Sequence, residues 1–121
     1  MKNNDIKQTD RVAVEMFDHI VSKQWALSDS QCQKLLGIES VEVQSAINSG
    51  MSLTEQQLKR VSLIIGIYRA LHILFINEQQ ANSWITKPNT AFDGQTALEV
   101  MLQTGISGLE QVNGYLQAQV H

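Results

Sequence analysis

The chain has 121 residues, of which 43% are hydrophobic and 17% charged, and its formal net charge at pH 7 is −3. This length suits one ordinary domain or two subdomains that share a core. The net negative charge excludes a general attraction to nucleic acid or anionic lipid, so any DNA contact would need a local patch. The single cysteine, Cys32, excludes an internal disulfide and a zinc site built on cysteines.

The N-terminal segment does not resemble a signal peptide, because no apolar stretch follows the charged residues 1–5. The most apolar run, residues 63–75, is interrupted by Arg69 and His72. It is also shorter than the roughly 20 apolar residues that cross a bilayer. We therefore expect a soluble protein in the cytoplasm, without a membrane segment.

The first part of the chain predicts three helices. Residues 1–8 are polar, and we expect them to be frayed. Apolar residues at helical spacing predict a first helix over 10–24. The capping box of residues 28–31 predicts a short second helix, which Gly37 ends. A third helix is predicted over 40–48.

A second capping box, at residues 54–57, predicts the start of the longest helix. This helix is expected over 55–76. It is apolar on nearly all sides in its second half, which indicates the central helix of the fold. Gly66 lowers helix stability by about 1 kcal/mol relative to alanine, and we expect it to mark a close helix crossing.

Three more helices are predicted after the long one. Asn77 can cap a fifth helix that ends near residues 84–86, because Pro88 prevents its continuation. Two further capping boxes, at 96–99 and 107–110, are expected to open helices six and seven. No segment alternates apolar and polar residues with a period of two, so no β-strand is predicted.

The predicted fold class is therefore all-α, a compact bundle of about seven helices around a long central helix. We expect two regions, residues 1–52 and 53–121. The first contains a helix-turn-helix-like arrangement, and the second contains the last three helices together with the long one.

No constellation of side chains indicates an enzyme. The three histidines, His19, His72 and His121, lie on separate predicted elements, and the common motifs of metalloproteases, serine hydrolases and nucleotide-binding enzymes are missing from the sequence. His72 on an apolar helix is best explained as a histidine at the edge of the core, and Cys32 at an inward position as a core residue. We predict no catalytic residue, no metal site and no cofactor.

Residues 27–50 have the order of a helix-turn-helix, with the turn Leu35-Leu36-Gly37-Ile38 between two helices. This segment resembles the Xre/Cro type of DNA-binding motif. Gln33 stands where such motifs usually have alanine, and Glu39 and Glu42 place negative charge on the recognition helix. DNA contact and a purely structural role therefore both stay open. The residues that would face DNA are Lys34, Ser40, Gln44, Ser45 and Asn48.

A short segment near the C-terminus carries a distinctive pattern. Trp84 stands at a helix end, Pro88-Asn89 form a stiff turn, Phe92 and Gly94 follow, and Thr-Ala-Leu-Glu at 96–99 opens the next helix. The pattern resembles the toxin-binding domain of the MbcA/ParS/Xre antitoxin family, which we expect over 53–121. Alanine stands where the family usually has proline in the helix start, and the cap itself is kept.

This resemblance implies a type II antitoxin without enzymatic activity, whose partner is a toxin of the RES-domain class. Such toxins resemble ADP-ribosyl transferases and consume NAD⁺, and the antitoxin is expected to cover the NAD-binding cleft. The family also implies a homodimer that represses its own operon by binding operator DNA. Because the C-terminal end of the antitoxin lies near the cleft in this family, we expect contacts from the exposed side of the last helix and from the 89–95 loop, with Tyr115 as the anchor. The expected toxin-binding residues are Asn89, Phe92, Asp93, Gly94, Asn113, Tyr115, Gln117, Gln119 and His121.

Two other functions stay open at this point. The chain could be a free-standing helix-turn-helix transcriptional regulator, which needs the DNA-binding face but no partner gene. It could also be an adaptor that uses the same C-terminal surface on a different enzyme. An adjacent reading frame that encodes a RES-type domain would favour the antitoxin over both.

Overall fold

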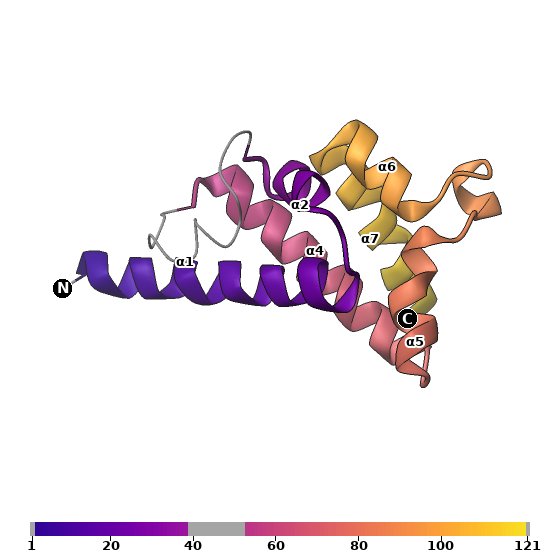
Figure 1. Ribbon diagram of the computed structural model, residues 1–121, viewed down its shortest axis with the longest axis horizontal. Helices are drawn as coiled ribbons and strands as arrows, with labels where there is room; N and C mark the ends of the chain where they lie inside the picture. Colours follow the sequence, from indigo (N-terminus) through magenta and orange to yellow (C-terminus); the bar gives the residue numbers. More distant parts are fainter. Residues whose placement is uncertain (1, 39–52, 121) are drawn as a thin grey trace. The chain divides into compact units, whose positions relative to one another are not determined.

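The computed structural model describes residues 2–38 and 53–120, and the regular elements in these ranges are helical (Figure 1). The predicted all-α fold is thereby confirmed. The chain divides into two compact units, Met1–Ser62 and Leu63–His121, and the long helix α4 contributes to both. In chain order the elements are α1 (Lys2–Asp18), η1 (His19–Gln24), α2 (Asp29–Leu36), α4 (Glu55–Leu74), α5 (Glu78–Ser83), η2 (Trp84–Thr86), η3 (Thr90–Phe92), α6 (Ala97–Thr104) and α7 (Ile106–Val120).

The first helical stretch begins earlier than predicted. α1 starts at Lys2 rather than near Asp10, because residues 2–9 contain no proline or glycine that would interrupt a helix. Its continuation, η1, is a π-helix, in which the backbone bonds span a wider turn. The predicted end of this stretch at Gln24 is confirmed. The helix predicted over 40–48 lies outside the described residues.

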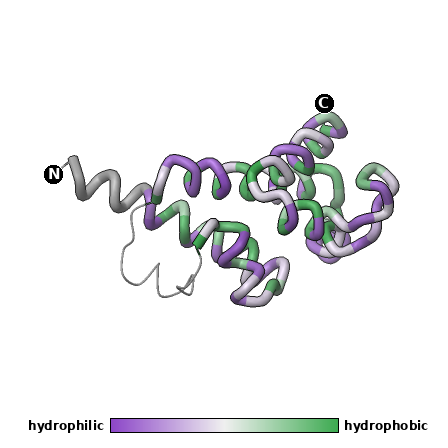
Figure 2. Tube along the Cα trace, turned by 90° about the horizontal axis from the view of Figure 1, so that it is seen from above, coloured by the Kyte–Doolittle hydropathy of each residue, from purple (hydrophilic) through white to green (hydrophobic). Residues whose placement is uncertain are grey.

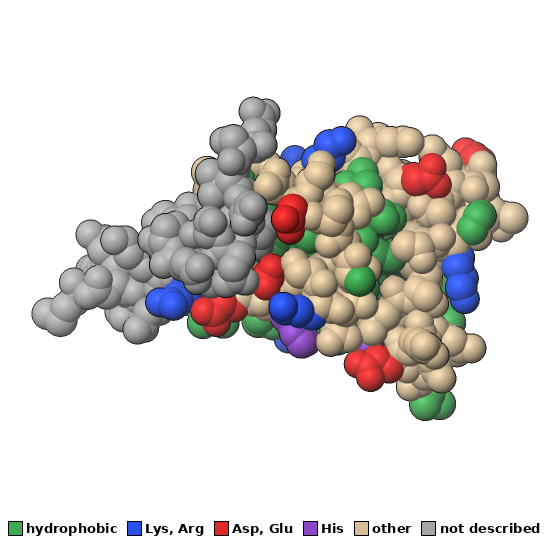
Figure 3. Space-filling view, viewed as in Figure 1, with side chains coloured by type: hydrophobic (Ala, Val, Ile, Leu, Met, Phe, Trp, Pro, Cys, Tyr) green, Lys and Arg blue, Asp and Glu red, His purple; other side chains and the backbone are tan. Residues whose placement is uncertain are grey.

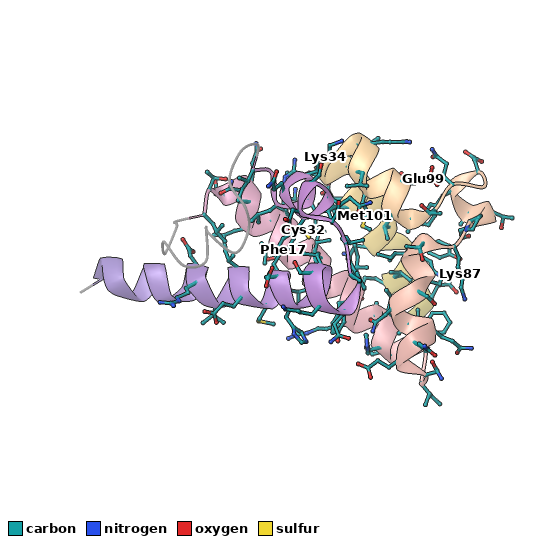
Figure 4. The ribbon with its side chains drawn as sticks, viewed as in Figure 1. Phe17, Cys32, Lys34, Lys87, Glu99 and Met101 are labelled. Carbon is teal, nitrogen blue, oxygen red and sulfur yellow. The ribbon has the colours of Figure 1, made fainter. Side chains whose placement is uncertain are left out.

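The core of the first unit forms from α1, η1, α2 and the start of α4. Phe17 on α1 and Cys32 on α2 are both almost completely buried (Figure 4). Burial of such side chains is the main stabilising term in a helical unit of this size. The buried hydrophobic residues of this unit are Val14, Phe17, Ile20, Val21, Trp25, Cys32, Leu35, Leu36, Leu53 and Val61.

Both ends of α2 have their backbone groups satisfied. At its start, Gln31 N–H donates to Ser28 Oγ at 3.2 Å and Ser28 N–H donates to Gln31 Oε1 at 3.0 Å, so the predicted capping box is confirmed. At its end, Gly37 adopts φ +82°, as predicted for a helix stop. Arg60 from α4 donates through Nη1 to the carbonyl oxygen of Lys34 at 3.2 Å and so caps the same end.

The predicted capping box at the start of α4 is also present. Gln57 N–H donates to Thr54 Oγ1 at 3.1 Å, and Thr54 N–H donates to Gln57 Oε1 at 3.0 Å. Just before it, Leu53 N–H donates at 2.9 Å to the carboxylate of Asp10, which is 4% exposed. α4 then runs to Leu74, slightly short of the predicted end at residue 76.

The second unit contains the second half of α4 and all elements that follow it. Asn77 caps α5 as predicted, since its Oδ1 accepts from Gln80 N–H at 3.0 Å. α6 and α7 lie side by side (Figure 1). The buried hydrophobic residues of this unit are Ile64, Ile67, Ala70, Leu71, Ala81, Ile85, Phe92, Ala97, Leu98, Val100, Met101, Leu109, Val112 and Leu116.

The start of α7 corrects the sequence analysis. The capping box predicted at 107–110 does not form, because the chain turns one residue after α6, at Gly105 (φ +62°), and α7 already begins at Ile106. Leu109 N–H donates to the carbonyl oxygen of Gly105 at 3.0 Å. Gly108 then lies within the first turns of α7, where a Cβ would collide with Val100 O of α6 and with Thr104 Oγ1.

The distribution of hydropathy agrees with packed amphipathic helices. In Figure 2 hydrophobic and hydrophilic residues alternate along the helical trace instead of forming separate blocks. Across residues 2–38 and 53–120, no helix is both long enough and apolar enough to cross a membrane.

Candidate functional site

The loop between η2 and α6 closes on itself through backbone hydrogen bonds. Pro88 and Thr96 form an isolated antiparallel bridge. Inside it, Asn89 N–H donates to Gln95 O, and Gly94 N–H donates to Asn89 O, both at 3.0 Å. The side chain of Asn89 accepts from the backbone N–H at position 91 at 2.9 Å and caps η3. The stiff turn predicted from the proline and asparagine is therefore confirmed, and it extends over the whole loop.

The tip of this loop has two consecutive residues with left-handed backbone. Asp93 has φ +56° and Gly94 has φ +86°. Glycine adopts such angles freely, as predicted, and aspartate is among the few other residues that tolerate them. Both residues are exposed, so the loop presents an exposed carboxylate.

Three aromatic rings hold the loop against α7, and we call them the aromatic cluster: Trp84, Phe92 and Tyr115. The rings of Trp84 and Tyr115 are stacked, with centroids 6.2 Å apart and an interplanar angle of 18°. Phe92 meets Tyr115 edge-on at 5.5 Å and Trp84 at 6.2 Å. These distances lie in the range in which aromatic pairs add stability beyond their burial.

The next helix starts directly after the loop. Glu99 N–H donates to Thr96 Oγ1 at 3.0 Å and Thr96 N–H donates to Glu99 Oε1 at 3.0 Å, which confirms the third predicted capping box. Ala97, at the position where proline is usual in the resembling family, is buried. Lys87 and Glu99 flank the loop on the outside of this unit (Figure 4).

One face of α7 packs against α4 at Gly66. Gln117 Nε2 donates to the carbonyl oxygen of Gly66 at 3.3 Å and to Asn113 Oδ1 at 3.2 Å. A Cβ on Gly66 would lie 2.9 Å from Asn113 Oδ1. The close helix crossing predicted at Gly66 is therefore confirmed, and the crossing partner is α7.

The structure separates the expected toxin-binding residues into four groups. Asp93, Gly94 and Gln119 are exposed. Asn89 and Tyr115 are half-buried, and Phe92 is only 4% exposed, so these three mainly shape the loop and its attachment to α7. His121 lies outside the described residues.

The remaining two members of that set correct one expectation. Asn113 and Gln117 were expected on the exposed side of the last helix, but they are half-buried and their amides face α4. The reason is that Gly66 leaves room for them, which is a property of another helix and cannot be read from α7 alone.

Of the candidate DNA-binding residues, only Lys34 is within the described ranges. It is exposed at the end of α2 (Figure 4). Ser40, Gln44, Ser45 and Asn48 lie outside the described residues.

Titratable side chains away from the loop have local roles. Burial raises the pKa of the Cys32 thiol, and the carboxylates of Asp18 and Asp29 raise it further, so the thiol stays protonated at neutral pH. The ring of His72 lies against the ring of Tyr68 at a tilt of 39°, with centroids 4.1 Å apart, and its Nδ1 lies 3.0 Å from Tyr68 O. These contacts agree with the core roles predicted for both residues. Across the described ranges, no group of three or more histidine, cysteine, aspartate or glutamate side chains is arranged to hold a metal ion.

Comparison with known proteins identifies the second unit. Residues 70–121 match the family model of the antitoxin Xre/MbcA/ParS C-terminal toxin-binding domain. The chain is also similar to the uncharacterized protein y4oB of Sinorhizobium fredii (strain NBRC 101917 / NGR234), with 37% identity over 107 residues that cover 88% of this chain and 82% of that protein. No solved structure matches the chain. The matched range contains α5, α6, α7 and the whole aromatic cluster.

Proposed function

This chain belongs to the Xre/MbcA/ParS antitoxin family, and on that premise we propose that it neutralises a RES-type, NAD⁺-consuming toxin by covering the active site of that toxin. Residues 70–121 are its toxin-binding domain, so a cognate toxin is its partner. The domain belongs to a family that is typically not enzymatic. Inhibition therefore depends on the shape and charge of the surface that the domain presents.

The observation that carries the proposal is the attachment of the 88–96 loop to α7 by the aromatic cluster. Because Trp84 and Phe92 both pack on Tyr115, the loop tip and the outer side of α7 form one rigid surface. A rigid surface loses little conformational entropy when it binds, which favours tight association. We assign the contacts with the toxin to the exposed Asp93, Gly94 and Gln119, with the ring edge of Tyr115 beside them.

Charge supports the same assignment. Residues 63–120 contain Arg69 and Lys87 as cations against four acidic residues, so this part of the chain carries a formal charge of 2 − 4 = −2. Few side chains in residues 63–120 are charged, and Figure 3 shows separate red and blue side chains among uncharged ones on one face of the molecule. A pocket that binds the pyrophosphate of NAD⁺ must be electropositive. The exposed carboxylate of Asp93 suits such a pocket, where it would take the place of the dinucleotide.

We also propose a homodimer and autorepression. Ile73 in the last turn of α4 and Ile76, two residues after this helix, are both exposed, and exposed large apolar side chains favour contact with a second copy. A dimer would present two copies of α2 with the exposed Lys34, which supports contact with the phosphates of operator DNA.

The test of the main proposal is co-expression of the chain with a RES-type toxin, taken from the adjacent reading frame where that frame encodes one. We expect a stable complex in size-exclusion chromatography and loss of NAD⁺ consumption by the toxin at equal concentration. A chain that binds operator DNA but forms no toxin complex would be a free-standing regulator. A complex with an enzyme that does not consume NAD⁺ would identify an adaptor.

A further inference from the structure

Among the described glycines, Gly114 is the one for which neither the backbone angle nor the packing within the chain requires a glycine. A glycine in the middle of a helix weakens the helix relative to alanine, so it usually has a compensating role. Three described glycines adopt positive φ, and at two others a Cβ would meet neighbouring atoms; these are Gly37, Gly94 and Gly105, and Gly66 and Gly108. At Gly114 a Cβ would meet nothing within 4 Å, and the residue is exposed.

The position of Gly114 on α7 creates a recess. Gln111, Gly114, Tyr115 and Ala118 stand at positions i, i+3, i+4 and i+7, which is the set of four residues that surrounds one hole in knobs-into-holes helix packing. We call this set the α7 hole. Gln111, Gly114 and Ala118 are exposed, and Tyr115 is half-buried. Since Gly114 and Ala118 have little or no side chain, the hole is open down to the helix backbone.

One wall of the hole is fixed in place. The ring of Tyr115 is stacked on Trp84 and meets Phe92 edge-on, so it cannot rotate over the hole without breaking both contacts. The hole therefore keeps its shape in the free protein. A preformed recess with an aromatic wall is the kind of pocket in which a buried anchor residue of a partner contributes most to binding.

We propose that the α7 hole receives an apolar side chain from a helix of the cognate toxin. The inference rests on the proposed function and adds the place and the chemistry of one contact. A helical partner follows from the spacing of the hole, and an apolar side chain follows from its walls, because none of its four residues carries a charge that would compensate a buried ion. The toxin is the partner because the hole lies within the matched toxin-binding domain.

The experiment measures toxin affinity and thermal stability for the same variants. Gly114→Leu fills the hole, and Gly114→Ala fills it partly. Gln79→Leu is the matched control, since it adds an exposed apolar side chain on α5 and leaves the four residues of the α7 hole unchanged. We expect Gly114→Leu to weaken the Kd for the RES-type toxin at least about tenfold. Gly114→Ala should raise the Tm of the free chain by about 2–5 °C and still weaken binding.

Each other result has a definite meaning. If the unaltered chain does not bind the RES-type toxin, the proposed function itself fails. If it binds and Gly114→Leu binds equally well, or if Gln79→Leu weakens binding as much, the hole is not a contact. A clear drop in Tm for Gly114→Ala would show that the fold needs this glycine, and the proposal would then be wrong.

A compensating change in the toxin identifies the inserted side chain. Exposed leucine, isoleucine, methionine and phenylalanine residues on toxin helices are replaced by alanine one at a time and tested against Gly114→Leu. We expect one replacement to restore most of the lost affinity, because the smaller toxin residue leaves room for the new leucine. If none does so, the partner residue is not an apolar side chain on a helix.

Discussion

A glycine lies at each of the two faces of α7, and the surroundings of these two glycines differ. On the inner face, Gly66 of α4 is covered by the amides of Asn113 and Gln117, and a Cβ there would lie 2.9 Å from Asn113 Oδ1. On the outer face, Gly114 has nothing within 4 Å of the corresponding position. The inner glycine is explained by packing within the chain, whereas the described residues around the outer one give no packing reason for a glycine, and we have proposed that a toxin side chain fills that space. The comparison shows that a glycine in a helix has to be judged from its surroundings, not from its helix propensity.

The largest effect is expected at a third glycine, which lies where α6 and α7 meet. In Gly108→Ala the new Cβ would collide with Val100 O, a backbone atom that cannot move without shifting α6. We expect a loss of about 2–3 kcal/mol in the free energy of unfolding, measured by urea denaturation. Gly114→Ala is the matched control and should gain about 1 kcal/mol. Equal effects at the two positions would contradict the distinction between packed and open glycines on α7.

The aromatic cluster should rank next. Phe92→Ala removes a buried ring that meets both Trp84 and Tyr115, and we expect it to destabilise the chain by about 3 kcal/mol. Because the loop then loses its attachment to α7, toxin binding should weaken as well. Phe92→Leu keeps most of the apolar volume and should cost less than half as much. Near-UV circular dichroism and the Kd for the toxin check the two effects separately, and an unchanged Kd in a folded Phe92→Ala chain would argue against the rigid loop as a contact surface.

Shortening α7 distinguishes the contribution of Gln117 on its inner face from that of the residues at its C-terminal end. A chain that ends at Gln117 keeps the hydrogen bond to Gly66 O, whereas a chain that ends at Leu116 loses it. We expect the second to be less stable than the first by about 1 kcal/mol. Both should bind the toxin more weakly than the full chain, because both lack Gln119. Equal thermal stability of the two shortened chains would mean that Gln117 contributes nothing at the crossing.

The smallest effect is expected at the loop tip. Asp93→Asn removes the charge but keeps a residue that tolerates φ +56°, so the Tm should not change. We expect toxin binding to weaken by about 0.5–1 kcal/mol at low salt, and the difference to shrink when the ionic strength is raised. A loss that does not depend on salt would speak against an electropositive surface facing this carboxylate.

Local signals explain most of what could be predicted. The capping boxes at Ser28, Thr54 and Thr96 and the helix stop at Gly37 each depend on residues within one turn, and all four were predicted correctly. The capping box predicted at Ser107 does not form, although it was predicted from the same kind of local spacing. Its spacing is correct, but Gly105 had already reversed the chain and started α7 one residue later.

The sequence identified the segment that forms the candidate site more reliably than it predicted which of its side chains are exposed. Trp84, Phe92 and Tyr115 were singled out from the sequence, but the stacking of Trp84 on Tyr115 joins residues far apart in the chain and has no local signal. Asn113 and Gln117 were placed on the wrong side of α7, because their outward or inward position depends on a glycine in α4. The open space at Gly114 could not be predicted from the sequence, because it depends on which residues of other helices pack around α7.

By itself, the sequence determined the helical class, most helix boundaries and the kinship of the C-terminal segment with toxin-binding domains. These properties depend on hydrophobic periodicity, caps and turn residues, which act over a few neighbouring positions. Only the tertiary structure decided which side of α7 is covered by α4, which side contacts the rings of Trp84 and Phe92, and which side stays exposed. Such choices depend on contacts between residues distant in sequence, whose geometry exists only after the helices have packed.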